Sequence, residues 1–166
     1  MAVRRLHNDD WGLETNCFVC EPRNDGGLRI PFFHDTERDV VTAEFELDDR
    51  FSGAPTLLHG GIALAVLDEA MAWACIAIGH RWAVTSEMST RFHRGLRVGR
   101  SYRVEAGVVG VDDDPAKIAA TALISGPDGR ARIEADAVFT VLGEAAAVRL
   151  IGDEVPERHR GYLRDE

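Results

Sequence analysis

Residues 60–78 form an apolar run that limits the folds open to this chain. Alanine, leucine, isoleucine, methionine and valine dominate the run, and only Asp68 and Glu69 are charged. A run of this length exceeds any usual strand and therefore predicts a helix. Its apolar residues are not confined to one stripe, so we expect the helix to be buried on nearly every side. The rest of the chain must supply the layer that wraps it.

Strand-like segments on both sides of this helix can supply that layer. Residues 40–47 alternate apolar and polar side chains, which is typical of a half-buried strand. Turn residues separate four more strand-like runs after the helix, and we expect these to form a meander: residues 82–93, 102–111, 117–125 and 132–142. The pattern predicts an α+β fold in which a curved antiparallel sheet is rolled around one long central helix.

The chain length allows one domain with short extensions, since 166 residues do not suffice for two independent cores. We expect the domain to span residues 27–142. An N-terminal segment, residues 1–26, precedes it and contains a Cys-x-x-Cys sequence. Residues 143–166 are rich in charge and predict a surface helix or a frayed tail.

Charge and cysteine content narrow the partners and the compartment. The 28 acidic and 19 basic side chains give a net charge of -9, so phosphate backbones repel the molecule and we expect no nucleic-acid partner. We also expect no membrane span, because Asp68 and Glu69 interrupt the apolar run at its middle. The first twelve residues lack the apolar run of a signal peptide, and three cysteines are too few for a disulfide scaffold. Both observations predict a cytoplasmic location.

The start of the predicted helix carries a family motif. Leu58-His59-Gly60-Gly61 opens the helix and Asp68-Glu69 lies inside it, which resembles the PaaI-like acyl-CoA thioesterases of the hotdog fold. The resemblance spans about residues 16–142 and includes these further matches: the loop Gly53-Ala-Pro-Thr-Leu, the strand Thr85-Ser-Glu-Met-Ser-Thr-Arg-Phe, the turn Gly95-Leu-Arg-Val-Gly99, and Cys17-Phe-Val-Cys20 with Asn24 and Gly27-Leu28. It implies thioester hydrolysis at sites on a dimer interface, with dimers commonly pairing into tetramers.

Thioester hydrolysis needs a carboxylate and a donor for the carbonyl oxygen. Asp68 is the candidate nucleophile or general base, and the unpaired amide of Gly60 at the helix N-terminus is the candidate donor. Eight residues separate them, about 12 Å along a helix axis, so one carbonyl group cannot touch both. The two groups must therefore come from two different helices, which predicts a site shared by two subunits.

The remaining candidates surround this pair. His59 either orients the helix start and its amide or contacts the thioester directly, and we expect the first. Thr85 matches a family position whose hydroxyl helps to place the nucleophilic water, although β-propensity alone also explains a threonine there. Gly61 and Glu69 are candidate substrate-binding residues; Glu69 points about 100° away from Asp68 around the helix, toward the partner or the sheet edge. The structural alternative is that both acids are simply solvated at a gap in the sheet or make a structural hydrogen bond.

Five arginines fall within thirteen residues that contain no acid, at positions 91, 94, 97, 100 and 103. We expect Arg91, Arg94 and Arg97 to bind the phosphates of coenzyme A, a task that suits guanidinium geometry. The alternative is a solvated strand and turn. No other cofactor is expected, because coenzyme A is part of the substrate.

Cys17 and Cys20 form a Cys-x-x-Cys pair that invites a zinc or redox interpretation. A zinc site needs four ligands and no second pair is visible, while Cys75 belongs to the apolar helix, so we expect no metal.

Two rival functions remain open. The family often has Asn where this chain has Gly53, a residue credited with supporting the substrate carbonyl. The departure supports a non-catalytic acyl-CoA-binding protein on the same fold. An enoyl-thioester hydratase or dehydratase is the second rival, but the catalytic His motif of those enzymes is not visible.

Overall fold

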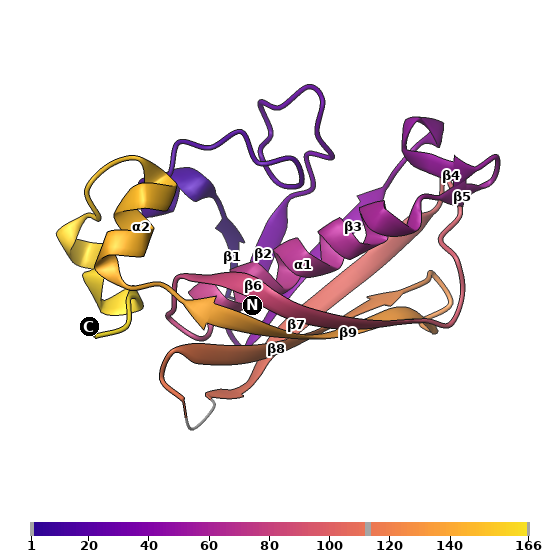
Figure 1. Cartoon of the computed structure of the whole chain (residues 1–166). Coiled ribbons are helices and arrows are strands. Elements are labelled where there is room, and N and C mark those ends of the chain that lie inside the picture. Colours follow the sequence, from indigo (N-terminus) through magenta and orange to yellow (C-terminus); the bar gives the residue numbers. More distant parts are fainter. Residues whose placement is uncertain (1, 112–113, 166) are drawn as a thin grey trace.

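The computed structural model describes residues 2–111 and 114–165, and within them one antiparallel sheet holds a central helix (Figure 1). Helix α1 spans Gly60–Ala77, and a second helix, α2, spans Glu144–Ile151. The sheet runs in the order β1-β2-β3-β7-β8-β9-β6. Its strands are β1 (Val3–Leu6), β2 (Phe32–Asp35), β3 (Val40–Glu46), β6 (Ala83–Phe92), β7 (Ser101–Val111), β8 (Lys117–Ser125) and β9 (Ala131–Val141). A small separate hairpin, β4 (Ser52–Ala54) and β5 (Leu57–Leu58), leads into α1.

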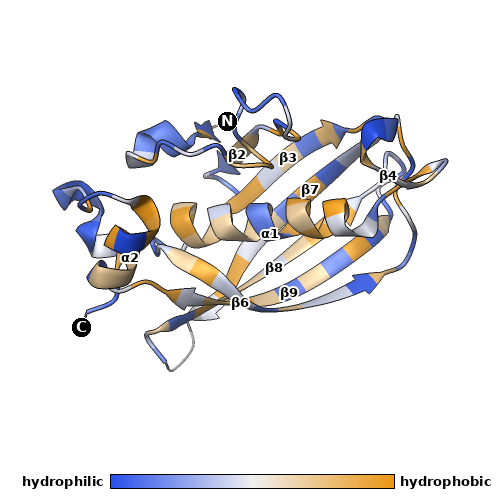
Figure 2. Ribbon diagram, turned by 45° about the horizontal axis from the view of Figure 1, so that its top comes forward, coloured by the Kyte–Doolittle hydropathy of each residue, from blue (hydrophilic) through white to orange (hydrophobic). Residues whose placement is uncertain are grey.

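Helix α1 lies across the hollow face of the sheet, as Figure 2 shows. Leu67 and Met71 on the helix and Phe139 on β9 have no exposed surface, and burial of this apolar area is the main force that holds helix and sheet together. By length and composition alone α1 would also suffice to cross a membrane. The predicted α+β arrangement is confirmed. The side of α1 away from the sheet is covered less than expected, since Leu64, Asp68 and Ala72 are only half-buried.

The predicted meander is wrong for its first strand. β7, β8 and β9 are consecutive neighbours, but β6 pairs with β9 at the far edge of the sheet. The connection 93–100 therefore runs from the edge strand β6 past β9 and β8 to β7. The buried side chain of Leu96 anchors it, and the carbonyl of Leu96 accepts a hydrogen bond from the backbone amide of Leu58. Periodicity identifies a strand but not its neighbours, because the ladder partners of a strand are chosen by packing against α1.

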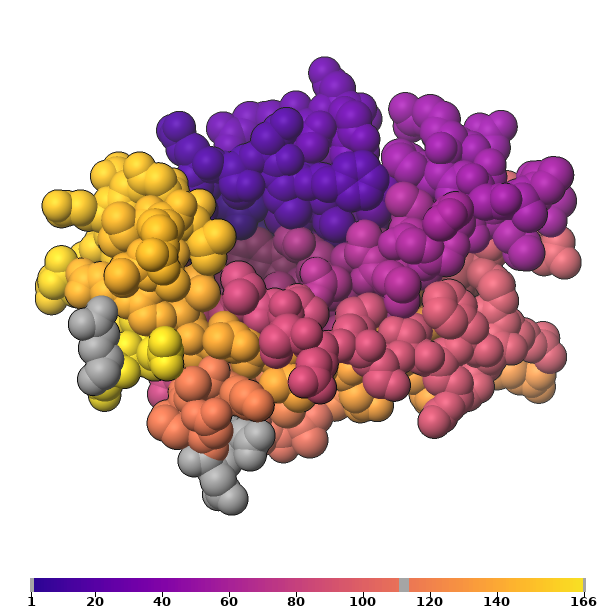
Figure 3. Space-filling view, in the orientation of Figure 1, coloured from indigo at the N-terminus to yellow at the C-terminus, as the bar shows by residue number. Residues whose placement is uncertain are grey.

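The N-terminal and C-terminal segments of the chain pack against each other, and their indigo and yellow surfaces meet in Figure 3. β1 adds an unpredicted strand beside β2. The ring of Trp11 packs against the tilted ring of His159 and meets Tyr162 edge-on, with centroids 5.1 and 5.0 Å apart. Of the two alternatives for the C-terminal segment, the structure shows a helix, α2, followed by the 3-10 turn Glu157–Tyr162. The division of the chain at residues 26 and 142 stays a prediction.

Candidate active site

The N-terminus of α1 is built around His59. His59 has extended backbone angles, and its Nδ1 accepts a hydrogen bond of 2.9 Å from the Gly61 amide. The side chain thus caps the helix, as Ser, Thr or Asp does elsewhere. This geometry agrees with the orienting role expected of His59. Among the described residues the Gly60 amide has no hydrogen-bond partner, so it is free at the positive end of the helix.

Gly53 lies in direct contact with this cap. A Cβ atom at position 53 would stand 2.9 Å from the Cα of His59 and 3.2 Å from its Cδ2. Contacts that short are not tolerated against backbone, so β4 can approach the cap only because residue 53 lacks a side chain. The backbone at this position therefore has no room for the Asn side chain that the family often carries there.

We expect Gly53→Ala to displace His59, to destabilise the protein by about 1–3 kcal/mol and to lower any activity that uses the Gly60 amide. Urea unfolding gives the first quantity. Gly107→Ala is the matched control, because a Cβ at position 107 meets nothing within 4 Å. Equal stability of the two variants would show that the close approach at Gly53 carries no cost.

Asp68 and Thr85 come together near the middle of α1. Thr85 Oγ1 donates a hydrogen bond of 2.5 Å to Asp68 Oδ1. Thr85 stands at a bulge of β6, where the pairing with β9 shifts between Thr85 and Glu87, and such bulges re-aim side chains next to functional sites. Ser86, the extra residue, is held by a hydrogen bond to the carbonyl of Val138. The structure thus joins two sequence-predicted candidates, and their catalytic roles stay predictions.

This pair is open to solvent in the single chain. Thr85 is exposed and Asp68 half-buried, and β6 beside them is an edge strand with most of its residues exposed. Gly60 lies on the same helix two turns away from Asp68. The Asp68 carboxylate and the Gly60 amide of one chain are therefore too far apart to contact the same carbonyl group.

Glu69, predicted to bind substrate and to point toward the partner or the sheet edge, lies against Cys17 and Cys20 of the N-terminal segment, and its role in binding stays a prediction. Burial, followed by the charge of Cys17, raises the pKa of Glu69 to about 8. Hydrogen bonding with the Cys20 side chain lowers the pKa of Cys17 to about 5, and the same bond raises the pKa of Cys20. Sequence reasoning missed this contact because the residues are far apart in the chain.

The predicted phosphate-binding arginines separate into two groups. Arg94 and Arg97 line a pocket of about 200 Å³, which is completed by Gly95, Arg100, Tyr102, Pro127 and Arg132. Arg91 instead lies 3.7 Å from Glu134, a carboxylate of β9. The pocket is close to the start of α1, because the backbone amide of Leu58 bonds to the carbonyl of Leu96 at 2.8 Å. Arg100 and Arg132 were not predicted as ligands.

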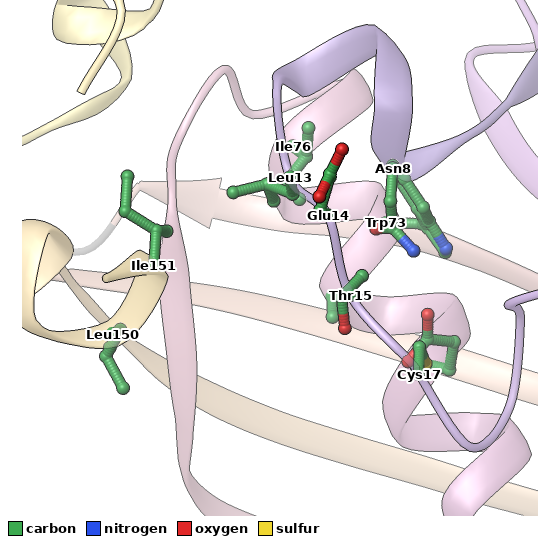
Figure 4. A pocket seen from close by; sticks show the side chains of 11 residues that line it. Asn8, Leu13, Glu14, Thr15, Cys17, Trp73, Ile76, Leu150 and Ile151 are labelled. Atoms are coloured by element: carbon green, nitrogen blue, oxygen red, sulfur yellow. The ribbon is translucent and has the colours of Figure 1, made fainter. Parts of the chain in front are cut away.

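A second pocket, of about 370 Å³, lies where the two ends of the chain meet α1 (Figure 4). Figure 4 shows the loop that carries Leu13, Glu14, Thr15 and Cys17 running beside α1. The complete lining is Asn8, Leu13, Glu14, Thr15, Cys17, Glu69, Ala72, Trp73, Ile76, Leu150 and Ile151. Glu69, the residue that follows Asp68 in the chain, is thus part of this lining.

Comparison with known proteins agrees with this architecture. Residues 56–121 match the family model of the thioesterase superfamily. A solved thioesterase superfamily protein is 24% identical with a TM-score of 0.70, and the match covers 80% of this chain and 64% of that one. This chain therefore spans less than two thirds of the length of that relative. No curated protein matches the chain.

Two further structures are similar. A Streptococcus mutans protein bound to acetyl CoA is 18% identical, with a TM-score of 0.58 and coverage of 63% of this chain and 82% of that one. The Escherichia coli PaaI protein from the phenylacetic acid degradation operon is 17% identical, with a TM-score of 0.57 and coverage of 63% and 74%. These likenesses confirm the expected hotdog fold.

Proposed function

We propose that this chain hydrolyses an acyl-CoA thioester to a free acid and coenzyme A at a site shared by two subunits. The match of residues 56–121 to the thioesterase superfamily model and the likeness in fold to a solved member of it support the proposal. The observation that carries the proposal is the hydrogen bond between Thr85 and Asp68, with a free helix N-terminus on the same helix. A carboxylate held by a neighbouring hydroxyl and a backbone amide without a partner are the two groups that the reaction needs.

Asp68 would act on the carbonyl carbon by one of two routes. As a general base it accepts a proton from water while the water oxygen attacks; the C–S bond then breaks and the thiolate of coenzyme A takes up that proton. As a nucleophile its free oxygen attacks the carbonyl carbon, the C–S bond breaks and the thiolate of coenzyme A leaves, so that an acyl-aspartate anhydride remains. Water then hydrolyses the anhydride, which releases the acid, restores the Asp68 carboxylate and supplies the proton that the thiolate takes up. In both routes the hydrogen bond from Thr85 occupies Oδ1 and leaves Oδ2 for the reacting oxygen. The developing oxyanion requires a donor on the opposite side, which Gly60 of a second chain supplies.

The free edge of β6 supports a pairing that supplies this donor. The ring of Phe92 lies 3.7 Å from the position of a Cβ on Gly60, and Thr85 contacts Asp68, so the two ends of β6 mark the two halves of the site. Antiparallel pairing of two β6 edges about a twofold axis near the strand middle would place Thr85 of one chain opposite Phe92 of the other. Asp68 and the Gly60 amide of two chains then approach each other. An unpaired edge of ten residues is also a ready template for such pairing.

The arginine pocket supports coenzyme A as the carrier. Arg94, Arg97 and Arg100 make no ion pair among the described residues, which leaves their guanidinium groups available for phosphates. The pocket lies at the end of the molecule where α1 begins, beside the proposed oxyanion donor. The bound acetyl CoA of the Streptococcus mutans protein is consistent with this ligand class. Thiol release from short, long and aromatic acyl-CoAs tests the activity and identifies the acyl group.

The oxyanion donor is tested by Gly60→Pro, which we expect to lower kcat about 10²- to 10³-fold. Proline removes the amide hydrogen but fits the first position of a helix, and the extended backbone of His59 suits a residue before proline. Gly60→Ala is the control, since it keeps the amide and its Cβ makes only ordinary contacts with Phe92. Equal rates for the two variants would remove the Gly60 amide from the mechanism.

The second candidate function is a non-catalytic acyl-CoA-binding protein, which Gly53 favours because no side-chain amide supports the carbonyl there. The two functions differ in one result. A binding protein retains acyl-CoA, measured by equilibrium dialysis, and releases no thiol from any member of the panel.

A further inference from the structure

Cys17, Cys20 and Glu69 form a cluster of metal-ligating side chains that the proposed reaction does not use. The two sulfur atoms and a carboxylate oxygen all lie within 4.8 Å of one another. The thiols come from the N-terminal segment and the carboxylate from α1, so it is the tertiary fold that brings them together. Thiolates combined with a carboxylate form a donor set that suits zinc and similar borderline cations.

The loop that carries the two cysteines has a defined conformation of its own. Asn24 Nδ2 donates to the carbonyl of Asn16 at 3.1 Å, and the Leu28 amide bonds to the carbonyl of Phe18 at 2.7 Å. A Cβ at Gly27 would stand 2.4 Å from that same carbonyl oxygen, so only glycine allows the loop to close. Both thiols face α1, since their sulfur atoms lie within 4.8 Å of a carboxylate oxygen of Glu69.

No Lys, Arg or His of the described residues makes an ion pair with Glu69, and Arg23, three residues after Cys20, pairs with Glu21 and Asp9. Asn8 Nδ2 lies 3.3 Å from Cys20 Sγ and donates a hydrogen bond to it, the kind of outer contact that orients a metal-bound ligand. A divalent cation would supply the missing positive charge.

We propose that Cys17, Cys20 and Glu69 bind one zinc-type divalent cation, with its fourth position open toward the neighbouring 370 Å³ pocket. Cys17 and Glu69 both line that pocket, which leaves room for a water molecule as the fourth ligand. Ligand atoms around tetrahedral zinc lie roughly 3.7 Å apart, so side-chain movements of about 1 Å close the site. The proposal departs from the expectation of no metal, which rested on the missing second pair of ligands; here a carboxylate from α1 would be the third ligand.

Such an ion would tie the N-terminal segment to α1 next to Asp68. The site is independent of the proposed hydrolysis, because neither Asp68 nor the Gly60 amide belongs to it. Its test therefore reads metal binding and stability rather than turnover. We expect the reduced full-length chain, stripped of metal with a chelator, to bind one Zn²⁺ and to unfold ~5 °C higher when zinc is present at about 100 times its Kd.

Variants and a spectroscopic probe identify the ligands. Co²⁺ added to the same protein should give a sulfur-to-metal charge-transfer band and the visible bands of a tetrahedral site. Cys17→Ser and Cys20→Ser should each abolish the charge-transfer band or reduce it, and Glu69→Gln should weaken Zn²⁺ binding at least about tenfold. Cys75→Ala removes a buried thiol outside the cluster, and Asp68→Asn removes the adjacent carboxylate; both should bind Zn²⁺ as the wild type does.

Three results would overturn the proposal. The first is that the freshly reduced wild-type chain binds less than one Zn²⁺ per chain. The second is that Glu69→Gln binds Zn²⁺ as tightly as the wild type. The third is that mass spectrometry finds a Cys17–Cys20 disulfide and no metal in protein purified without chelator. Because Asp68→Asn should lose hydrolysis and keep the metal, failure of this proposal and failure of the proposed function are distinguishable.

Discussion

Asp68→Asn is expected to lower kcat for acyl-CoA hydrolysis by about 10³-fold, because the amide can neither accept a proton from water nor attack the carbonyl carbon. The substitution keeps the size of the side chain and an oxygen that accepts the hydrogen bond from Thr85. The fold and the binding of acyl-CoA should therefore persist. Thiol release by the wild type and the variant on the same substrate measures the effect, and equilibrium dialysis measures binding.

Asp136→Asn is the matched control. Asp136 is an exposed carboxylate of β9 whose neighbours in the strand, Ala135 and Ala137, point to the core, so its side chain lies on the face of the sheet opposite α1. Its loss changes the net charge by the same amount and should leave the rate unchanged. An Asp68→Asn enzyme that turns over at the rate of the control would exclude Asp68 from the chemistry.

Two inactive variants are expected to restore activity when they share a dimer. Co-expression of Asp68→Asn with Gly60→Pro creates mixed dimers in which one site carries both lesions and the other site carries neither. If each site takes Asp68 from one chain and the Gly60 amide from its partner, random mixing should recover roughly one quarter of the wild-type activity. This recovery is large against the residual activity of either variant alone.

A site contained within one chain gives the opposite result, because every site then retains one lesion and the mixture stays as inactive as its parts. The oligomeric state during turnover provides an independent check. A species that sediments as a monomer and still releases thiol would contradict the distance argument, since Asp68 and Gly60 lie two turns apart on α1.

The elements that could be predicted from sequence are those with a local physical cause. The length and composition of residues 60–78 predict α1, and alternation predicts β3, β8 and β9, because burial of one face imposes a period on the sequence. His59, Gly60 and Asp68 could be named because their order and spacing match the motif of the family that the chain resembles. The hydrogen bond between Asp68 and Thr85 follows only after β6 is placed, but the family motif had already indicated both residues.

Other features have no local signal. β6 pairs with β9 at the far edge of the sheet, and the pattern of residues within β6 does not specify that partner. The acid-free stretch of arginines did not imply free arginines, since Arg91 meets Glu134 of β9 and Arg103 bonds to Glu105 at 3.0 Å. The close approach of Gly53 to His59 likewise could not be read from the residue type alone.

The sequence by itself determined the central helix and most of the strands that wrap it, because these depend on periodicity, and its family motif placed the two candidate groups, Gly60 and Asp68, on that helix. The tertiary structure alone decided which distant groups meet. It placed the hydroxyl of Thr85 on Asp68 and gathered Cys17, Cys20 and Glu69 into one cluster. The physical reason is that contacts between elements are selected by the packing of the whole core, whose partners are separated by long stretches of chain.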